Sequence, residues 1–106
     1  MQDALEALSE PRRRKILRLV RDGELAAGEI ASHFDVTRPA ISQHLTVLKG
    51  AGLVNERREG TRRLYRARPE GLAPIREFIE GFWDDKLERL RQAAEEEERS
   101  GDGTRR

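Results

Sequence analysis

The amino-acid sequence predicts a mainly α domain of the α+β class, with about five helices and one two-stranded β-hairpin. Three observations favour this class. Apolar residues recur at helical spacing in several short segments, most clearly between Thr37 and Gly52. Two strand-like runs flank a glycine-containing turn at Gly60, and a long amphipathic segment follows them. We expect one domain over residues 1–99, because 106 residues suffice for a single modest core, and a disordered tail over 100–106.

Composition excludes several kinds of site. Cysteine is absent, so the chain has no disulfide framework, thiolate metal site or cysteine nucleophile. The two histidines, His33 and His44, cannot complete a four-ligand zinc site unless several carboxylates converge on them. No apolar run approaches the length of a membrane span, and the N-terminus lacks the apolar region of a signal peptide. We therefore expect a cytoplasmic protein that contacts no membrane and carries no metal or other cofactor.

The net charge of +1 hides an uneven distribution of charge along the chain. Residues 11–22 carry six basic side chains against one acid, and residues 38–68 carry eight against two. The segments before, between and after these two blocks are acidic. Such blocks of positive charge indicate a surface for an anionic partner.

The N-terminal region predicts two short helices. The first spans residues 3–8, with Leu5 and Leu8 on one apolar edge. The second runs to about residue 21, with Ser9 as its N-cap and Pro11 in its first turn. Its buried stripe comprises Ile16, Leu17 and Val20. The four consecutive basic residues of this helix, 12–15, serve either solubility or phosphate binding. After the helix, residues 24–26 are long enough only for a bridging strand.

Residues 27–50 predict a helix-turn-helix. A first helix over about 27–34 precedes a tight turn at 35–36, and a second helix spans about 37–50. Thr37 is a good N-cap for the second helix, and glycines mark its exit.

The second of these helices has two contrasting faces. One face carries a narrow apolar stripe of Ile41, Leu45 and Leu48. The opposite face is nearly free of carboxylates and carries hydroxyl, amide and amino groups, which can read base edges and bind phosphates. Its residues are Pro39, Ser42, Gln43, Thr46 and Lys49, with Arg38 at the edge. His44 lies at the flank, where it could touch a phosphate or pack against a neighbour, and the sequence leaves both open.

The runs 53–58 and 62–67 predict a β-hairpin around Gly60 and Thr61. Six arginines fall within it or directly after it, at positions 57, 58, 62, 63, 66 and 68. A bare two-stranded arm with so much like charge would repel itself, so we expect an anionic partner. The alternative is an edge hairpin whose charge protects it from aggregation.

The last predicted helix spans about 70–98. Its apolar residues cover about 180° of the circumference, whereas a helix that covers one side of a domain needs about 100°. The wider stripe indicates a second apolar contact, most economically with a second copy of the chain. These residues are Leu72, Ile75, Phe78, Ile79, Phe82, Trp83, Leu87 and Leu90.

A helix-turn-helix followed at once by a basic hairpin is the layout of a winged helix. Several segments also resemble one family: LSEPRRRKIL from Leu8, GEIA from Gly28, AISQHL from Ala40, Leu48, AGLV from Ala51, and Glu59-Gly60 before Tyr65. On these segments the chain resembles the arsenical-resistance-repressor (ArsR) family of bacterial transcription regulators. The resemblance covers about residues 4–92.

The resemblance implies a homodimer, built from the first and last helices, that binds an inverted-repeat operator in double-stranded DNA and represses transcription. The implied dimer contacts are Leu5, Leu8, Ile75, Phe78, Ile79, Phe82, Trp83, Leu87 and Leu90. The implied base-reading residues are Arg38, Pro39, Ser42, Gln43 and Thr46. Thr37 and Lys49 would meet phosphates, and Arg58, Thr61 and Arg62 would form the tip of the wing.

The chain departs from the metal-sensing members of that family. Those members place cysteines near the start of the third helix, where this chain has Glu24 to Gly28, or Asp and His ligands on the final helix, which has no histidine here. We therefore expect the metal-independent branch, some of whose members repress their own operons. Phe82 and Trp83 have two interpretations: they bind a small ligand that releases the protein from DNA, or they serve only apolar packing.

Two other functions compete with a sequence-specific repressor. A sequence-indifferent architectural DNA binder would carry more lysine or arginine on the outer face of the 37–50 helix. A winged-helix protein-interaction module would carry acids there or on the wing, where Glu56 and Glu59 are the candidates. We do not expect an enzyme, since no paired carboxylates, Ser/His/Asp ordering or glycine-rich phosphate loop can be identified.

Overall fold

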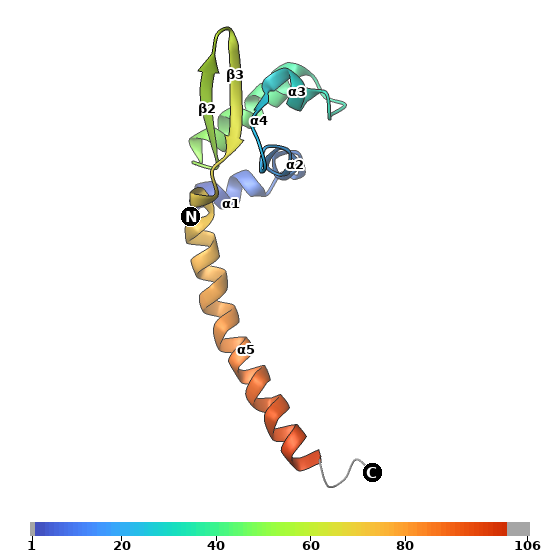
Figure 1. Cartoon of the computed structure of the whole chain (residues 1–106), viewed down its shortest axis with the longest axis vertical. Helices are drawn as coiled ribbons and strands as arrows, with labels where there is room; N and C mark the ends of the chain where they lie inside the picture. Colours follow the sequence, from blue (N-terminus) through green and yellow to red (C-terminus); the bar gives the residue numbers. More distant parts are fainter. Residues whose placement is uncertain (1, 102–106) are drawn as a thin grey trace. The chain divides into compact units, whose positions relative to one another are not determined.

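The computed structural model describes the backbone of residues 2–101 and the side chains of residues 3–99. Within this part the chain forms five α-helices, three strands and one short 3-10 helix (Figure 1). The predicted mainly α class with a β-hairpin is therefore confirmed. The chain divides into two compact units, Met1–Ile75 and Arg76–Arg106, which are described separately.

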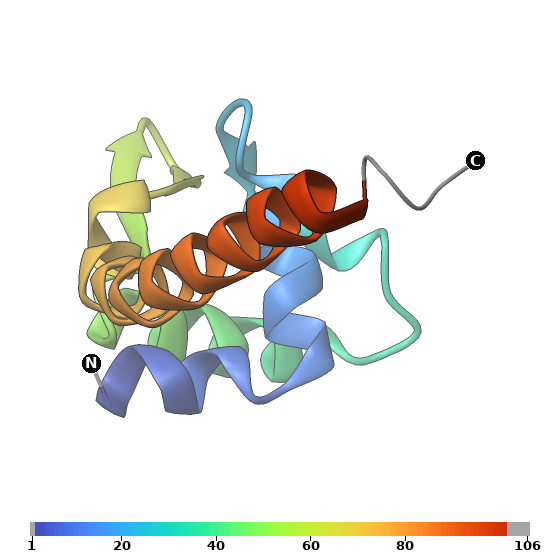
Figure 2. The same ribbon diagram turned by 90° about the horizontal axis from the view of Figure 1, so that it is seen from below.

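The first unit is built on three helices that contact one another: α1 (Gln2–Leu8), α2 (Pro11–Leu19) and α4 (Arg38–Gly50) (Figure 2). Its core consists of aliphatic side chains that are at most 2% exposed. They are Ile16, Val20, Ile30, Ile41, Leu45, Leu48, Leu53 and Val54. Ala4 and Ala7 are also buried, and such small side chains allow α1 to lie close to its neighbours.

The N-cap of α2 is Glu10 and not Ser9, so that part of the prediction was wrong. The Glu10 carboxylate accepts the backbone N–H groups of Arg12, at 2.7 Å, and of Arg13, at 3.3 Å. Partial burial disfavours the charged carboxylate, but these two hydrogen bonds and nearby positive charge together hold the pKa of Glu10 below its ordinary value. The Ser9 hydroxyl instead donates to the Glu6 carbonyl at the end of α1, at 2.6 Å.

The helix-turn-helix consists of α3 (Ala27–Ala31) and α4. α3 is shorter than the predicted 27–34, because the chain leaves the α-helix after Ala31. The Ser32 hydroxyl donates to the Glu29 carbonyl, and the amides of His33 and Phe34 bond three residues back. α4 begins where predicted: the Thr37 hydroxyl accepts the Ala40 amide at 3.3 Å.

The hairpin strands β2 (Val54–Glu59) and β3 (Arg62–Ala67) are joined by a turn in which Gly60 has φ of 64°. The bridging strand β1 (Leu25–Ala26) pairs with β3, so the sheet has three antiparallel strands in the order β1-β3-β2. The register places Leu25 and Glu56 on either side of Tyr65. The predicted two-stranded wing is therefore attached to the helix-turn-helix through β1.

α4 ends in a tight turn that depends on glycine. Gly52 has φ of 75°, and the Leu53 amide bonds back to the Leu48 carbonyl at 2.9 Å, which is the pattern of a Schellman motif. The 3-10 helix η1 (Pro69–Leu72) crosses this turn so closely that a β-carbon on Gly71 would lie 2.1 Å from the Gly52 carbonyl oxygen.

Helix α5 (Ala73–Gly101) begins in the last three residues of the first unit and forms the described part of the second unit. Exposed ion pairs one turn apart join Arg76 to Glu80 and Arg91 to Glu95. Seven of the nine predicted dimer contacts are 44–63% exposed: Leu5, Phe78, Ile79, Phe82, Trp83, Leu87 and Leu90. The other two, Leu8 and Ile75, pack against the core. The predicted tail lies outside the described residues from 102 onward, and no described helix is long and apolar enough to cross a membrane.

Gly71→Ala should lower the free energy of unfolding by about 1–3 kcal/mol, because the new methyl group would clash with the Gly52 carbonyl. Urea unfolding at equal protein concentration measures this change. Gly50→Ala is the matched control, since no heavy atom lies within 4 Å of a β-carbon at that position. Equal stability of the two variants would contradict the close backbone crossing.

Candidate nucleic-acid interface

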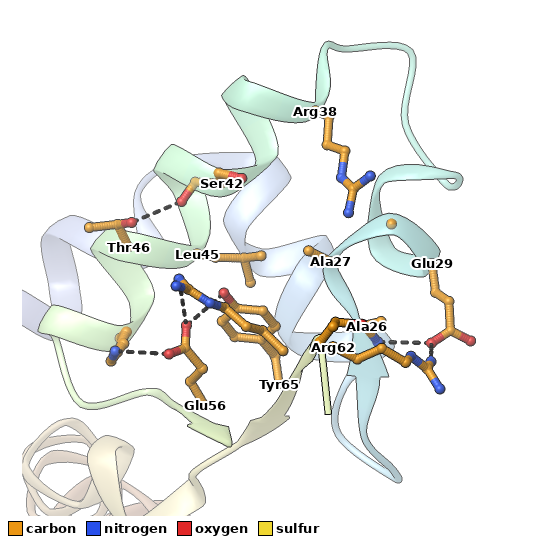
Figure 3. Close-up of a pocket in the computed structure, with 14 residues that line it drawn as sticks. Ala26, Ala27, Glu29, Arg38, Ser42, Leu45, Thr46, Glu56, Arg62 and Tyr65 are labelled. Carbon is orange, nitrogen blue, oxygen red and sulfur yellow. Dashed lines mark hydrogen bonds and ion pairs between the residues drawn. The ribbon is translucent and has the colours of Figure 1, made fainter. Parts of the chain in front are cut away.

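A groove of about 720 Å³ lies between α4 and the hairpin (Figure 3). Six of the ten predicted DNA-binding residues line it: Arg38, Ser42, Thr46, Lys49, Thr61 and Arg62. The remaining four, Thr37, Pro39, Gln43 and Arg58, are exposed but are not part of its lining. The apolar stripe of α4 faces the core, with Ile41, Leu45 and Leu48 at most 1% exposed, so the helix turns its polar face outward.

Two hydroxyl groups on α4 have backbone partners. The Thr46 hydroxyl donates to the Ser42 carbonyl at 3.0 Å, which leaves its oxygen as an acceptor towards the groove (Figure 3). Thr37 uses its oxygen as the N-cap of α4 and keeps its hydroxyl proton to donate. Both side chains can therefore still make one directed hydrogen bond to a ligand.

Arg38 lies across the start of α3. A β-carbon on Gly28 would lie 3.5 Å from Arg38 Nη2, an ordinary van der Waals distance, so the guanidinium packs against the backbone at this position. The guanidinium thereby sits at the end of the groove where the two helices of the helix-turn-helix meet.

Several arginines of the hairpin have carboxylate partners within the chain. Arg57 bonds both oxygens of Glu24, at 2.6 and 2.8 Å, and also contacts Glu59 at 2.9 Å. Arg62 bonds Glu29 of α3 at 2.9 Å. The Arg57 hydrogen bonds hold the pKa of Glu24 below its ordinary value. Carboxylates within the chain therefore balance part of the positive charge of the hairpin, at Arg57 and Arg62.

Glu56 links the hairpin to the last turn of α4. Its carboxylate accepts the Tyr65 hydroxyl at 2.8 Å and Lys49 Nζ at 3.3 Å, and Arg63 Nη1 lies 4.0 Å away (Figure 3). The hydrogen bond from Tyr65, together with Lys49, outweighs partial burial and holds the pKa of Glu56 below its ordinary value. Burial, and then the hydrogen bond to Glu56, raise the pKa of Tyr65.

The sequence left open whether His44 packs against a neighbour or touches a phosphate, and the structure shows a contact with a neighbouring side chain. Arg13 Nη1 lies 3.3 Å from His44 Nδ1. Within the described residues, no group of three or more His, Asp or Glu side chains could hold a metal ion.

Comparison with known proteins decides the family. A sequence model described as bacterial regulatory protein, arsR family, matches residues 10–56. The HTH-type transcriptional regulator Rv2034 of Mycobacterium tuberculosis is 45% identical over 101 residues, which are 95% of this chain and 92% of that protein. The chain belongs to the ArsR family of bacterial transcription regulators. It is therefore a DNA-binding transcription regulator.

Other ArsR-family likenesses agree with this assignment. The transcriptional repressor SdpR of Bacillus subtilis is 45% identical over 60 residues, 57% of this chain and 67% of that protein. A crystal structure of a possible transcriptional regulator for arsenical resistance matches with a TM-score of 0.70 and 46% identity, over 86% of this chain and 95% of that one. The homodimeric winged helix-turn-helix DNA-binding domain Mb0332 of Mycobacterium bovis matches with a TM-score of 0.63 and 36% identity. The match covers 81% of this chain and 80% of that one.

The sequence interpretation missed four side chains of the groove: Glu29, Glu56, Arg63 and Tyr65. The sequence did contain a signal for the Glu56–Tyr65 pair, in the length of the hairpin turn. A two-residue turn at 60–61 places Glu59 opposite Arg62, and counting back along both strands brings Glu56 opposite Tyr65. The Arg62–Glu29 contact has no comparable signal, since it joins residues from separate elements.

Glu56→Gln should reduce stability at pH 7 and also flatten the loss of stability in acid. A carboxylate whose pKa is lowered in the folded state stabilises it above the ordinary glutamate pKa of about 4.3, and this contribution is lost as the pH falls. Urea unfolding at several pH values between about 7 and 3 should show the two proteins converging towards low pH. Glu77→Gln, at an exposed position of α5, is the control and should show no convergence; parallel curves for Glu56→Gln would contradict the ion-pair role.

Proposed function

We propose that this ArsR-family regulator is a homodimeric, sequence-specific repressor that reads an inverted-repeat operator with α4 and responds to no metal ion. The observation that carries the proposal is the outer face of α4. Ser42, Gln43 and Thr46 stand exposed on it, and basic side chains border the adjoining groove. Hydroxyl and amide groups bordered by cations are typical of a helix that reads base edges between two phosphate backbones.

Each element of the interface has its own part in this proposal. Arg38, Pro39, Ser42, Gln43 and Thr46 face the bases of the major groove, and Thr37 and Lys49 meet phosphates. Arg58, Thr61 and Arg62 at the tip of the hairpin follow the adjacent backbone or minor groove. The cations supply much of the affinity through counterion release, so binding should weaken steeply with salt.

Homodimerisation is supported by the homodimeric Mb0332 neighbour and by the exposed apolar side chains of α5. An unpartnered row of large side chains such as Phe78, Phe82 and Leu90 favours burial against another protein surface. Two copies would present their α4 helices to successive major grooves about 34 Å apart.

Repression is supported by the names of similar proteins, including SdpR and the arsenical resistance operon repressor of Staphylococcus xylosus. Independence of metal is supported by the donor chemistry, since the chain has no cysteine and only two histidines.

Fluorescence anisotropy tests the proposal with DNA from upstream of the gene for this protein, scrambled DNA, and duplexes selected from a random library. Each titration is run at two salt concentrations, without and with zinc. We expect tight binding to the upstream or selected duplex, weak binding to scrambled DNA, and no effect of zinc. Equal affinity for all duplexes would favour an architectural binder, and no binding at low salt would favour a protein-interaction module. Release of the operator by zinc would overturn metal independence.

Gln43→Ala should weaken operator binding by about tenfold and relax the preference at one base pair, while binding to scrambled DNA stays unchanged. Arg62→Ala should weaken binding to both DNAs and lower the salt slope by about 1, because it removes a phosphate contact. Arg18→Ala, at an exposed position of α2, removes the same charge away from the groove and serves as the control. Equal losses from the Gln43 and Arg62 variants on both DNAs would contradict these separate roles.

A further inference from the structure

Arg13 joins three helices through its side chain. Its Nε donates to the Ala7 carbonyl at 2.7 Å, and its Nη2 donates to the Glu6 carbonyl at 3.2 Å, both near the end of α1. Its Nη1 lies 3.3 Å from His44 Nδ1 on α4. The side chain is half-buried, and its own backbone belongs to the first turn of α2.

The chemistry of these groups gives each contact a direction. A guanidinium is always charged and can only donate, so His44 Nδ1 can take part in this contact only as the acceptor. The Glu6 and Ala7 carbonyls lie in the last turn of α1, where the helix dipole favours a cation, and a guanidinium can bond both of them. Two of the three acceptors lie on α1 and the third lies on α4. The planar guanidinium of Arg13 therefore fixes the position of α4 relative to α1.

Arg13 is itself held in place on both sides. The Glu10 carboxylate and carbonyl accept its backbone amide at 3.3 and 3.1 Å. The neighbouring Arg14 donates to the Leu8 carbonyl at 2.7 Å, which also ties α1 to α2. Because α1, α2 and α4 contact one another directly, the guanidinium bridges elements that already pack together (Figure 2).

We propose that Arg13 is a positioning residue that sets the orientation of the recognition helix α4 on α1, and that it acts through His44. This inference rests on the proposed function, in which α1 belongs to the dimer contact and α4 reads DNA. In such a dimer the distance between the two recognition helices must match the spacing of the half-sites. That distance depends on how α4 is held on the dimer contact. Three of the five N–H groups of Arg13 contact acceptors within the protein, so we expect it to set half-site spacing without a phosphate contact.

The test compares Arg13→Lys, His44→Leu and their double variant in the full chain. Lysine keeps the charge but cannot bridge three acceptors, and leucine removes the acceptor on α4. The probes are the selected operator duplex, versions with one base pair added or removed between the half-sites, and scrambled DNA. Far-UV circular dichroism, urea unfolding and sedimentation confirm that each variant is folded and dimeric.

We expect Arg13→Lys to weaken binding to the selected duplex by about tenfold, as much as one mismatched base pair, and to flatten the preference for half-site spacing. Binding to scrambled DNA and the salt slope should stay as in the parent. His44→Leu should behave alike, and the double variant should be no worse than either single one, because both remove the same link. His44→Gln, which keeps an acceptor, should retain operator binding, and Arg18→Lys, at an exposed position of the same helix, is the matched control.

Three results would overturn this inference alone. A salt slope lowered by about 1 would make Arg13 a phosphate contact. Additive losses in the double variant would mean that Arg13 and His44 act separately. Loss of the dimer at working concentrations would assign Arg13 to the dimer contact itself. A parent protein that binds selected and scrambled duplexes equally would instead overturn the proposed function, and this inference with it.

Discussion

Burial of one apolar stripe on α4 is the constraint on which the rest of the structure depends. Ile41, Leu45 and Leu48 are almost completely buried, and each contributes about 1.5–3 kcal/mol relative to an exposed position. Rotation of the helix about its axis would expose this stripe, so the polar face must point outward. The Thr37 cap and the Schellman turn at Gly52 determine where the helix begins and ends. The outward position of the face proposed to read DNA is therefore a consequence of core packing rather than of the polar residues themselves.

Charge in the wing serves two opposing needs. A DNA-binding hairpin must carry cations, yet closely spaced arginines destabilise the free protein. Carboxylates reduce the repulsion by pairing with nearby cations. The pairs are Glu24 with Arg57, Glu29 with Arg62, and Glu56 with Lys49. Both partners of the Arg62–Glu29 pair are more than half exposed, and an ion pair of that kind contributes about 1 kcal/mol or less. In the proposed complex a DNA phosphate could therefore replace Glu29 at little energetic cost, and in the absence of DNA Glu29 keeps Arg62 paired.

Local patterns predicted the elements that have strong local signals. α4 was predicted with its N-cap, its buried stripe and its exit, because all of these depend on residues within a few positions of each other. The same reasoning placed the N-cap of α2 at Ser9, because serine is a favoured N-cap by sequence and glutamate is not. In the structure the Glu10 carboxylate caps the helix instead. It also extended α3 past Ala31, because apolar spacing continues to Phe34 while the backbone has already turned.

The sequence by itself determined the helix-turn-helix, the hairpin and the uncharged-polar face of α4, since periodicity, capping and turn chemistry act over short distances. The sequence also determined that the chain has only two imidazole ligands and no thiolate ligand for a metal ion. Only the tertiary structure decided which charges meet, because the Arg62–Glu29 and Arg13–His44 contacts join residues 33 and 31 positions apart. Such contacts arise from the way α2, α3, α4 and the sheet pack together. No local pattern encodes that geometry.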